Sequence, residues 1–258
     1  MFALGAAACV LGYLFLLSLT GLGRQGPTAG ILPVVVLAAS VSWLTLRSLR
    51  ADRLPSALLG FTRDVRPLTH FALGFLGGSV LAGLWLAIVM AITGASFLPN
   101  PTFRAGALLG ACVFILFNNA AEELVYRGYA FVRLADRYGA MLAIGITSSL
   151  FALLHLQAGI PLLSVLAGVL TTGLVLGALF ARWRSLPLAL GFHVATNVIQ
   201  EASGLRSSPA SLFAPTYPPS ASAVGNATLV GIALVNVVLA VGLFRVARRS
   251  GLSPARSN

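Results

Sequence analysis

The sequence predicts an all-α fold, a polytopic membrane helix bundle of about eight transmembrane helices. Apolar residues make up 58% of the 258 residues and charged residues only 9%, with a mean hydropathy of +0.93. Soluble domains carry roughly a quarter charged residues, so this chain has too little charge to build a water-facing surface. The apolar residues also gather in long runs, with arginines between the runs. We therefore expect a single membrane domain over residues 1–258.

Each predicted transmembrane helix is a run of about 18 or more largely apolar residues, long enough to cross a bilayer. The runs cover residues 2–20, 29–48, 69–93, 104–126, 139–158, 160–181, 186–201 and 224–246. The first lacks the charged start and the cleavage site of a signal peptide, so we expect it to remain a span. The seventh is short, and the fourth is expected to continue as a polar helix to about residue 136.

The arginines predict the orientation. With eight spans, 14 of the 17 basic residues fall on one side, and only Arg24, Arg104 and Arg206 fall on the other. Because positively charged loops stay on the cytoplasmic side, we expect both termini in the cytoplasm and a location in the plasma (cytoplasmic) membrane. Residues 202–223 are rich in Ser and Pro and are predicted to form a flexible external loop.

The net charge of +11 comes entirely from arginine and does not indicate a nucleic-acid partner. No basic stripe with interleaved aromatic residues is present, so the expected partners are the lipid bilayer and a membrane substrate, with no nucleic acid. Cys9 and Cys112 both lie in apolar runs, which leaves no disulfide framework and no cysteine metal cluster.

Four ionisable residues lie well inside predicted spans, whereas His70 and Glu201 lie at the ends of spans. Glu122 and Glu123 are adjacent in the fourth span, while His155 and His193 lie in the fifth and seventh. Such residues are costly in a membrane and are therefore candidates for a functional site. Hydrogen bonding between helices would explain one of them, but it explains the whole set poorly.

Helical spacing separates the two glutamates. Residues four apart share a helix face, so Glu123 is predicted to pair with Arg127. Glu122 is rotated by about 100° from Glu123 and has no such cation, although Asn118 lies one turn before it. Glu123 is thus expected to be structural and Glu122 to be available for chemistry.

Two further pairs have the same spacing. His193 and Asn197 place an imidazole beside an amide, and Phe151 and His155 place a ring beneath an imidazole. The fourth and fifth spans form a hairpin that turns near Tyr138–Gly139. Glu122 and His155 lie equally far from that turn, so we expect them to meet at one depth with His193, in the cytoplasmic half of the bilayer.

Three chemistries fit such a cluster. In the first, Glu122 is the general base for a water molecule, and His155 orients the water or protonates the leaving group. His193 and Asn197 then donate hydrogen bonds to the oxyanion that develops. In the second, Glu122, His155 and His193 bind a divalent metal such as zinc, with one position open for water. No HExxH motif is present, so a zincin site is excluded. In the third, the cluster is a proton or ion pathway.

The three motifs together resemble a known family of membrane proteases. Glu122-Glu123-Leu-Val-Tyr-Arg127 matches EExxxR, Phe151-Ala-Leu-Leu-His155 matches FxxxH, and His193-Val-Ala-Thr-Asn197 matches HxxxN. This is the pattern of the CPBP family (CAAX protease and bacteriocin-processing, or Abi), which includes the Rce1-like prenyl-protein endopeptidases. The resemblance covers a catalytic core at about residues 104–200.

The resemblance implies an intramembrane endopeptidase whose site opens toward the cytoplasm. Members are often labelled metalloproteases, but a glutamate-base mechanism needs no metal, and we favour the version without a cofactor. The implied substrate is a peptide or protein, either lipid-modified and of the CAAX type or bacteriocin-related. The residues implied in catalysis are Glu122, His155, His193 and Asn197, and the supporting residues are Glu123, Arg127 and Phe151.

Two other classes of function fit the composition. A proton-coupled membrane transporter would use the buried Glu and His residues, but the sequence lacks the visible repeats and broken paired spans of such carriers. A non-catalytic immunity factor or scaffold would retain the fold without using the motifs.

Overall fold

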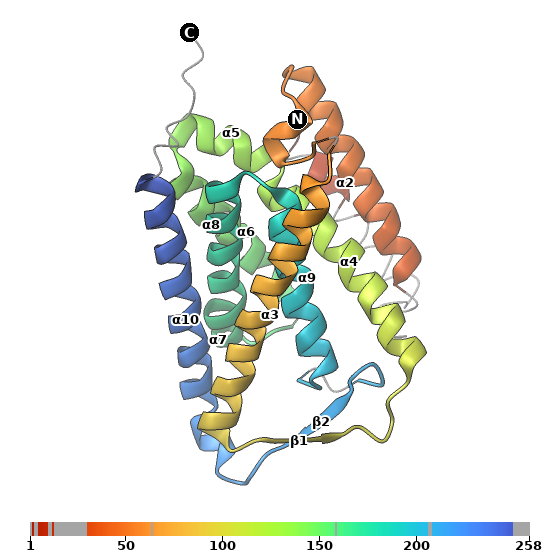
Figure 1. Cartoon of the computed structure of the whole chain (residues 1–258), viewed down its shortest axis with the longest axis vertical. Coiled ribbons are helices and arrows are strands. Elements are labelled where there is room, and N and C mark those ends of the chain that lie inside the picture. The colour runs from red at the N-terminus through yellow and green to blue at the C-terminus, as the bar shows by residue number, and fades with distance from the viewer. Residues whose placement is uncertain are drawn as a thin grey trace.

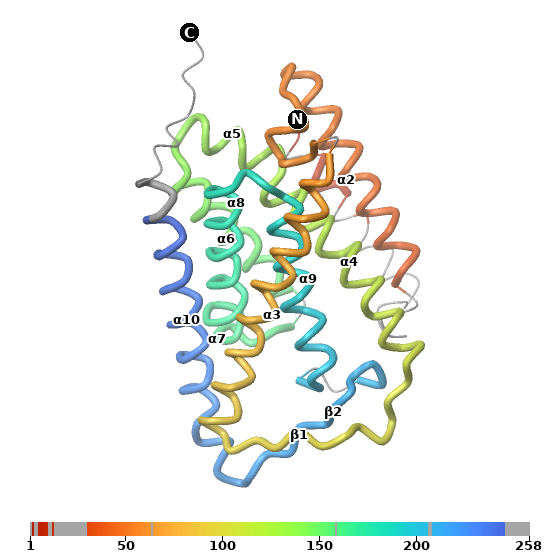
Figure 2. The backbone as a smooth tube through the Cα atoms, in the orientation of Figure 1, coloured from red at the N-terminus to blue at the C-terminus, as the bar shows by residue number. Residues whose placement is uncertain are grey.

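The computed structural model describes residues 2, 5–9, 12, 30–62, 64–157, 159–205 and 208–249, and it confirms the predicted helical fold class (Figures 1 and 2). Its α-helices are α2 (Ile31–Ala51), α3 (Arg66–Thr93), α4 (Ala105–Arg127), α5 (Tyr129–Tyr138), α6 (Ala140–Gln157), α7 (Leu162–Ser164), α8 (Thr171–Trp183), α9 (Leu186–Ala202) and α10 (Ala221–Arg249). The other elements are a 3₁₀ helix, η2 (Ser56–Leu59), a π-helix, η3 (Val165–Leu170), and two strands, β1 (Ser96–Pro99) and β2 (Phe213–Thr216).

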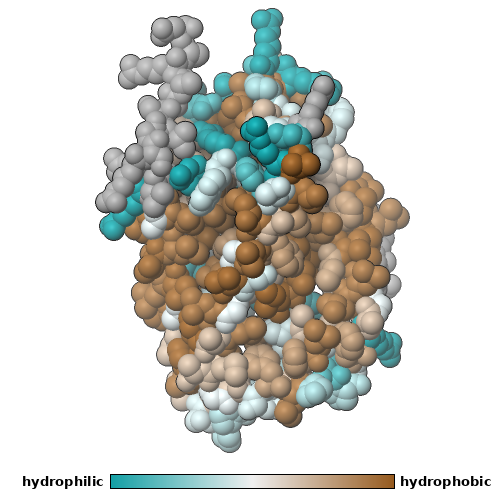
Figure 3. All heavy atoms as spheres, viewed as in Figure 1, coloured by the Kyte–Doolittle hydropathy of each residue, from teal (hydrophilic) through white to brown (hydrophobic). Residues whose placement is uncertain are grey.

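Six helical stretches of the described residues are long and apolar enough to cross a membrane. They are Ile31–Ala51, Arg66–Thr93, Ala105–Tyr138, Ala140–Gln157, Leu162–Trp183 and Ala221–Arg245. The seventh predicted span is α9, which has 17 residues and is the shortest of the predicted spans that the structure describes. Most of the first predicted span, 2–20, lies outside the described residues. Figure 3 shows a broad apolar belt below a hydrophilic end, as expected of an integral membrane protein.

The polar helix predicted after the fourth span is present as α5, but it is not continuous with α4. The chain breaks at Gly128, and α5 lies across one end of the bundle (Figure 1). A Cβ atom at Gly128 would collide with the carbonyl group of Leu124, so the close turn requires glycine. The hairpin still turns at Gly139, where φ is positive, but the expected depth of Glu122 assumes a helix without the break at Gly128.

Small residues bring α3 and α9 into close contact. The glycines Gly74 and Gly78 lie one turn apart on α3 and face the backbone of α9 at Leu188 and Phe192. Any Cβ at those glycines would overlap that backbone, as is typical of small-xxx-small contacts between membrane helices. This contact holds the short helix α9, which carries the HxxxN motif, inside the bundle (Figure 2).

The predicted span at 160–181 is not one regular α-helix. The short helix α7 leads into the π-helix η3, and α8 follows. A π-helical turn is rare and occurs often at functional sites. Here Gly168 and Val169 of η3 line the cavity described below.

Residues 202–223, predicted to be a flexible loop, contain the strand β2. It pairs antiparallel with β1, from Ser96 opposite Thr216 to Pro99 opposite Phe213. The Asn100 amide strengthens this connection by donating to the carbonyls of Ser208 at 3.1 Å and Ser211 at 2.8 Å. The paired strands cross the end of the bundle opposite α5 (Figures 1 and 2).

Candidate active site

The predicted ion pair within α4 is present and fully buried. Arg127 Nη1 lies 3.0 Å from Glu123 Oε1, and both side chains are 0% exposed. The guanidinium also donates through Nη2 to the carbonyl of Gly173 on α8, at 3.0 Å. The central carbon of the guanidinium, Cζ, lies 5.1 Å from the centre of the Phe151 ring. Arg127 therefore connects α4, α6 and α8, and its charge is balanced by Glu123.

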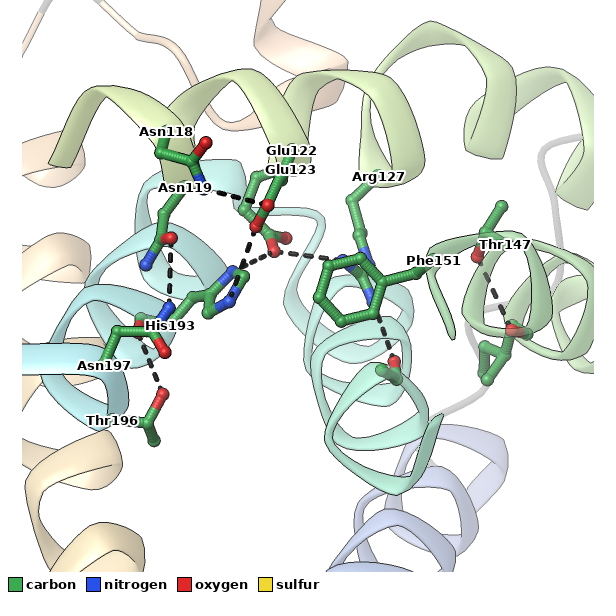
Figure 4. A network of polar contacts seen from close by, with 12 residues as sticks. Asn118, Asn119, Glu122, Glu123, Arg127, Thr147, Phe151, His193, Thr196 and Asn197 are labelled. Atoms are coloured by element: carbon green, nitrogen blue, oxygen red, sulfur yellow. Dashed lines mark hydrogen bonds and ion pairs between the residues drawn. The ribbon is translucent and has the colours of Figure 1, made fainter. Parts of the chain in front are cut away.

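Glu123 has a second partner, His193 of α9 (Figure 4). His193 Nδ1 lies 2.9 Å from the same Oε1 atom that binds Arg127. An ionised carboxylate only accepts hydrogen bonds, so Nδ1 carries the hydrogen and donates it. The other ring nitrogen, Nε2, lies 3.7 Å from Glu122 Oε2. The imidazole is thus held between the two adjacent glutamates.

Glu122 differs from Glu123 in both partners and exposure. Its Oε1 accepts a hydrogen bond from Asn118 Nδ2 at 2.9 Å, as the helical spacing predicts. Its side chain is 23% exposed, whereas that of Glu123 is 0% exposed. Although they are adjacent in sequence, Glu123 is a buried structural carboxylate, whereas Glu122 is a carboxylate that is accessible from a cavity.

His155 is oriented by its own helix. Its Nδ1 lies 2.8 Å from the carbonyl oxygen of Phe151, which can only accept, so Nδ1 donates. In a neutral imidazole Nε2 is then the acceptor. The Phe151 ring lies 4.5 Å from the His155 ring and 5.8 Å from the His193 ring, centre to centre. Phe151 therefore separates the two imidazoles, and it also contacts the guanidinium of Arg127.

The predicted convergence of Glu122, His155 and His193 is present, because all three line one cavity of about 500 Å³. Its polar lining is Asn118, Asn119, Glu122, His155, Ser164, Thr172, His193, Thr196, Asn197 and Gln200. Its largest apolar lining residues are Trp85, Phe114, Phe151, Ile160, Leu229 and Ile232. Helices α3 and α10, whose role the sequence did not indicate, thus contribute to the wall through Trp85, Leu229 and Ile232.

Asn119 is a site residue that the sequence analysis did not identify. Its Oδ1 accepts a hydrogen bond from Asn197 Nδ2 at 3.1 Å, which links α4 to α9 (Figure 4). The residue is buried, at 1% exposure. Its spacing of four residues from Glu123 became informative only with the structure, which shows that Glu123 contacts His193 and Asn119 contacts Asn197.

A second buried polar network borders the same cavity through Trp85 and Thr172. Trp85 Nε1 donates to Asn236 Oδ1 at 3.0 Å, and Asn236 Nδ2 donates to Thr171 at 2.9 Å and to Thr172 at 3.3 Å. These contacts join α3, α8 and α10. Every side chain in this network is uncharged.

The predicted metal ligands do not form a three-ligand set in this arrangement. Among the residues that the structure describes, no group of three or more His, Cys, Asp or Glu side chains could hold a metal ion. Nδ1 of His155 donates to a backbone carbonyl and Nδ1 of His193 donates to Glu123, which leaves Nε2 as the remaining nitrogen of each ring. The metal alternative therefore stays a prediction.

One cavity between the helices is thus lined by a carboxylate, two imidazoles and an amide. Groups of this kind can activate water for hydrolysis and stabilise an oxyanion. Residues 104–199 match the family model described as "Type II CAAX prenyl endopeptidase Rce1-like". This match confirms the resemblance inferred from the three motifs, all of which lie inside it. No curated protein and no solved structure is significantly similar to the chain.

Residues 104–199 are thus similar to a CAAX-type protease family, and the helical fold is that of an integral membrane protein. The matched segment begins at the residue before α4 and ends within α9. It therefore includes every side chain of the network drawn in Figure 4.

Proposed function

We propose that this protein is an intramembrane endopeptidase in which Glu122 activates a water molecule for attack on a peptide bond. The observation that carries the proposal is that the two adjacent glutamates differ in burial and in their partners. Glu123 is fully buried and bonded to Arg127 and His193, whereas Glu122 is partly exposed to a cavity that both histidines line.

In the first step, Glu122 accepts a proton from water while the water oxygen attacks the carbonyl carbon of the substrate. Nε2 of His155 accepts the second hydrogen of the same water as a hydrogen bond, which orients its lone pair toward the carbon. This role follows from the Nδ1–H donation to the Phe151 carbonyl, which leaves Nε2 as the acceptor of a neutral ring.

In the second step, the negative charge that develops on the substrate oxygen is stabilised by hydrogen bonds. In this step both ring nitrogens of His193 carry a hydrogen: Nδ1–H stays bonded to Glu123, and Nε2–H is donated to the substrate oxygen. The amide of Asn197 is the second donor. Glu122 then gives the proton to the leaving nitrogen, the carbon–nitrogen bond breaks, and a carboxylic acid and an amine are released.

The proposed substrate is the C-terminal tail of a lipid-modified peptide or protein, with bacteriocin-related processing as the other activity of this family type. The description of the matched family as a prenyl endopeptidase supports a CAAX-type tail. We further propose a cytoplasmic membrane location with both termini and the site opening facing the cytoplasm, because 14 of 17 arginines fall on one side of the predicted spans. Nucleic acid has no part in the proposal, and neither does a metal cofactor.

The test uses full-length protein in liposomes and a quenched fluorescent peptide that ends in a prenylated cysteine and three further residues. A matched peptide with an unmodified cysteine measures the need for the lipid. Wild type should cleave the lipidated peptide, and Glu122→Gln should lower kcat by about 10²–10⁴-fold because it removes the general base. Equal rates for the two proteins would contradict the proposal.

Chelation separates the metal-free mechanism from the metal alternative. Cleavage by wild type is expected to persist after prolonged treatment with a chelator and dialysis. Activity that is lost on chelation and restored by zinc would contradict the metal-free version, while leaving the protease assignment intact.

A further inference from the structure

The proposed base, Glu122, is held by a neutral amide from its own helix (Figure 4). Asn118 Nδ2 donates to Glu122 Oε1 at 2.9 Å, across one turn of α4, and both side chains line the cavity. An ionised carboxylate can only accept hydrogen bonds, so the nitrogen of the Asn118 amide must be the atom that faces it. The chemistry of Glu122 therefore fixes which way the amide of Asn118 faces.

The contact makes the two oxygens of Glu122 different. Oε1 is bonded to Asn118, whereas Oε2 lies 3.7 Å from His193 Nε2, which is too far for a hydrogen bond. The last torsion of a glutamate side chain has only weak preferences, so a carboxylate without such a partner turns easily. With Asn118 in place, Oε2 is the oxygen that stays available to a water molecule in the cavity.

A neutral donor suits a general base better than a cation does. Glu123, whose task is structural, shares its Oε1 between Arg127 and His193. A cation so close to a carboxylate stabilises its ionised form and opposes the uptake of a proton. Asn118 orients Glu122 without adding charge. It can also keep its hydrogen bond after the proton transfer, because Oε1 of the acid remains an acceptor when Oε2 carries the hydrogen.

Stability gives little reason for the contact. Asn118 and Glu122 are both half-buried and both line the cavity, so water could satisfy the same atoms. A hydrogen bond that replaces one with water adds little to the free energy of unfolding. The contact is therefore better explained by the orientation of Glu122 than by the packing of α4.

We infer that Asn118 is a positioning residue for peptide-bond hydrolysis, which holds the Glu122 carboxylate so that Oε2 takes the proton from water. The inference rests on the proposed function. It assigns a task to a residue that lies outside the three sequence motifs, and it names the oxygen of Glu122 that acts as the base.

The test compares variants of Asn118 on the lipidated reporter peptide in liposomes. Asn118→Leu removes the donor at similar size, and it should lower kcat by about tenfold or more with KM within about twofold of wild type, since a misplaced reacting group is costly in the transition state. Its unfolding temperature should stay near that of wild type. The control is Asn236→Leu, which removes a buried interhelical amide elsewhere and should leave the kcat of the folded protein unchanged.

Two further variants separate orientation from packing. Asn118→Gln keeps an amide that can donate across one helical turn, so it should recover most of the kcat that Asn118→Leu loses. Asn118→Asp has the shape of asparagine but offers only acceptors when ionised, so it should be at least as slow as Asn118→Leu. If Asn118→Leu does not fold, Asn118→Ala takes its place.

Peptide binding distinguishes positioning of the base from direct contact with the substrate. Glu122→Gln should be inactive and still offers Asn118 an acceptor oxygen, so the Kd of the intact lipidated peptide can be measured on it. Adding Asn118→Leu to Glu122→Gln should leave that Kd within about twofold, because Asn118 acts on the base and not on the peptide.

The inference is overturned if Asn118→Leu or Asn118→Asp has the kcat of wild type, if Asn118→Gln is as slow as Asn118→Leu, or if Asn118→Leu weakens peptide binding to Glu122→Gln. An inactive Glu122→Gln alongside any of those results would reject only the role of Asn118. An active Glu122→Gln would reject the proposed function itself.

Discussion

Two buried polar networks border the same cavity, and they differ in charge and in how completely their atoms are paired. The network of α4 and α9 contains Glu123, Arg127 and His193, and it faces Glu122. The network of α3, α8 and α10 is uncharged and centres on Asn236, whose oxygen and nitrogen are both hydrogen-bonded.

The two networks also differ in how many of their buried polar atoms have hydrogen-bond partners. Within the described residues, three buried side-chain atoms of the network of α4 and α9 have no hydrogen-bond partner: Glu123 Oε2, Arg127 Nε and Asn119 Nδ2. The other such atoms, Thr45 Oγ1, Ser148 Oγ and Arg182 Nε, belong to neither network. Unpaired buried atoms weaken a fold, so the charged network carries a cost that the Asn236 network does not. The Asn236 network has the simpler task of joining three helices at the cavity wall. The two networks therefore predict different results on mutation.

The largest effect is expected from Arg127→Leu. This change removes the cation that balances Glu123, and leaving one charge of a buried pair without its partner destabilises a protein by about 3–5 kcal/mol. The measurement is thermal unfolding of the purified protein in detergent, followed by the tryptophan signal. Arg137→Leu, on α5 at the end of the bundle, is the matched control and should unfold near the wild-type temperature. Equal unfolding temperatures for the two variants would contradict the structural role of the buried pair.

The next effect is on catalysis rather than stability. His155→Ala removes the acceptor nitrogen that orients water, and a positioned acid–base group of this kind contributes about 10²-fold or more to the rate. The measurement is kcat on the lipidated reporter in liposomes. His70→Ala is the control, because His70 contacts Ser185 away from the cavity at 2.8 Å. Comparable kcat values for His155→Ala and wild type would remove His155 from the mechanism.

The smallest effect is expected from the second network. Asn236→Leu replaces an uncharged buried amide with an apolar side chain of similar size, so the loss of stability should be about 1 kcal/mol. The kcat of the folded protein should stay within about twofold of wild type. A loss of kcat as large as that of His155→Ala would show that the two networks do not divide stability and catalysis as described here.

The parts of the site that were predicted correctly depend on local helix geometry. The contact of Glu123 with Arg127, that of Asn118 with Glu122, and the edge-to-face contact of His155 with Phe151 all follow from a spacing of four residues in a helix. The bundle itself follows from long apolar runs, which have few alternatives in a membrane.

The features that were missed depend on tertiary structure. The break at Gly128 depends on how α5 turns away from α4, and the pairing of β1 with β2 joins segments far apart in the chain. Asn119 was overlooked because an uncharged residue beside Asn118 gives no signal until its partner on α9 is known. The convergence on one cavity was predicted correctly, although the depth argument behind it assumed a helix that the structure interrupts.

The central claim is that Glu122 activates the water that cleaves the peptide bond. The most direct test incubates wild type and Glu122→Gln with the lipidated peptide in liposomes prepared in H₂¹⁸O, and analyses the peptides by mass spectrometry. The account predicts that wild type yields two fragments, of which the N-terminal one carries ¹⁸O in its new carboxyl group. Glu122→Gln should leave the peptide intact over the same interval. Labelled fragments formed by Glu122→Gln at the wild-type rate would contradict it.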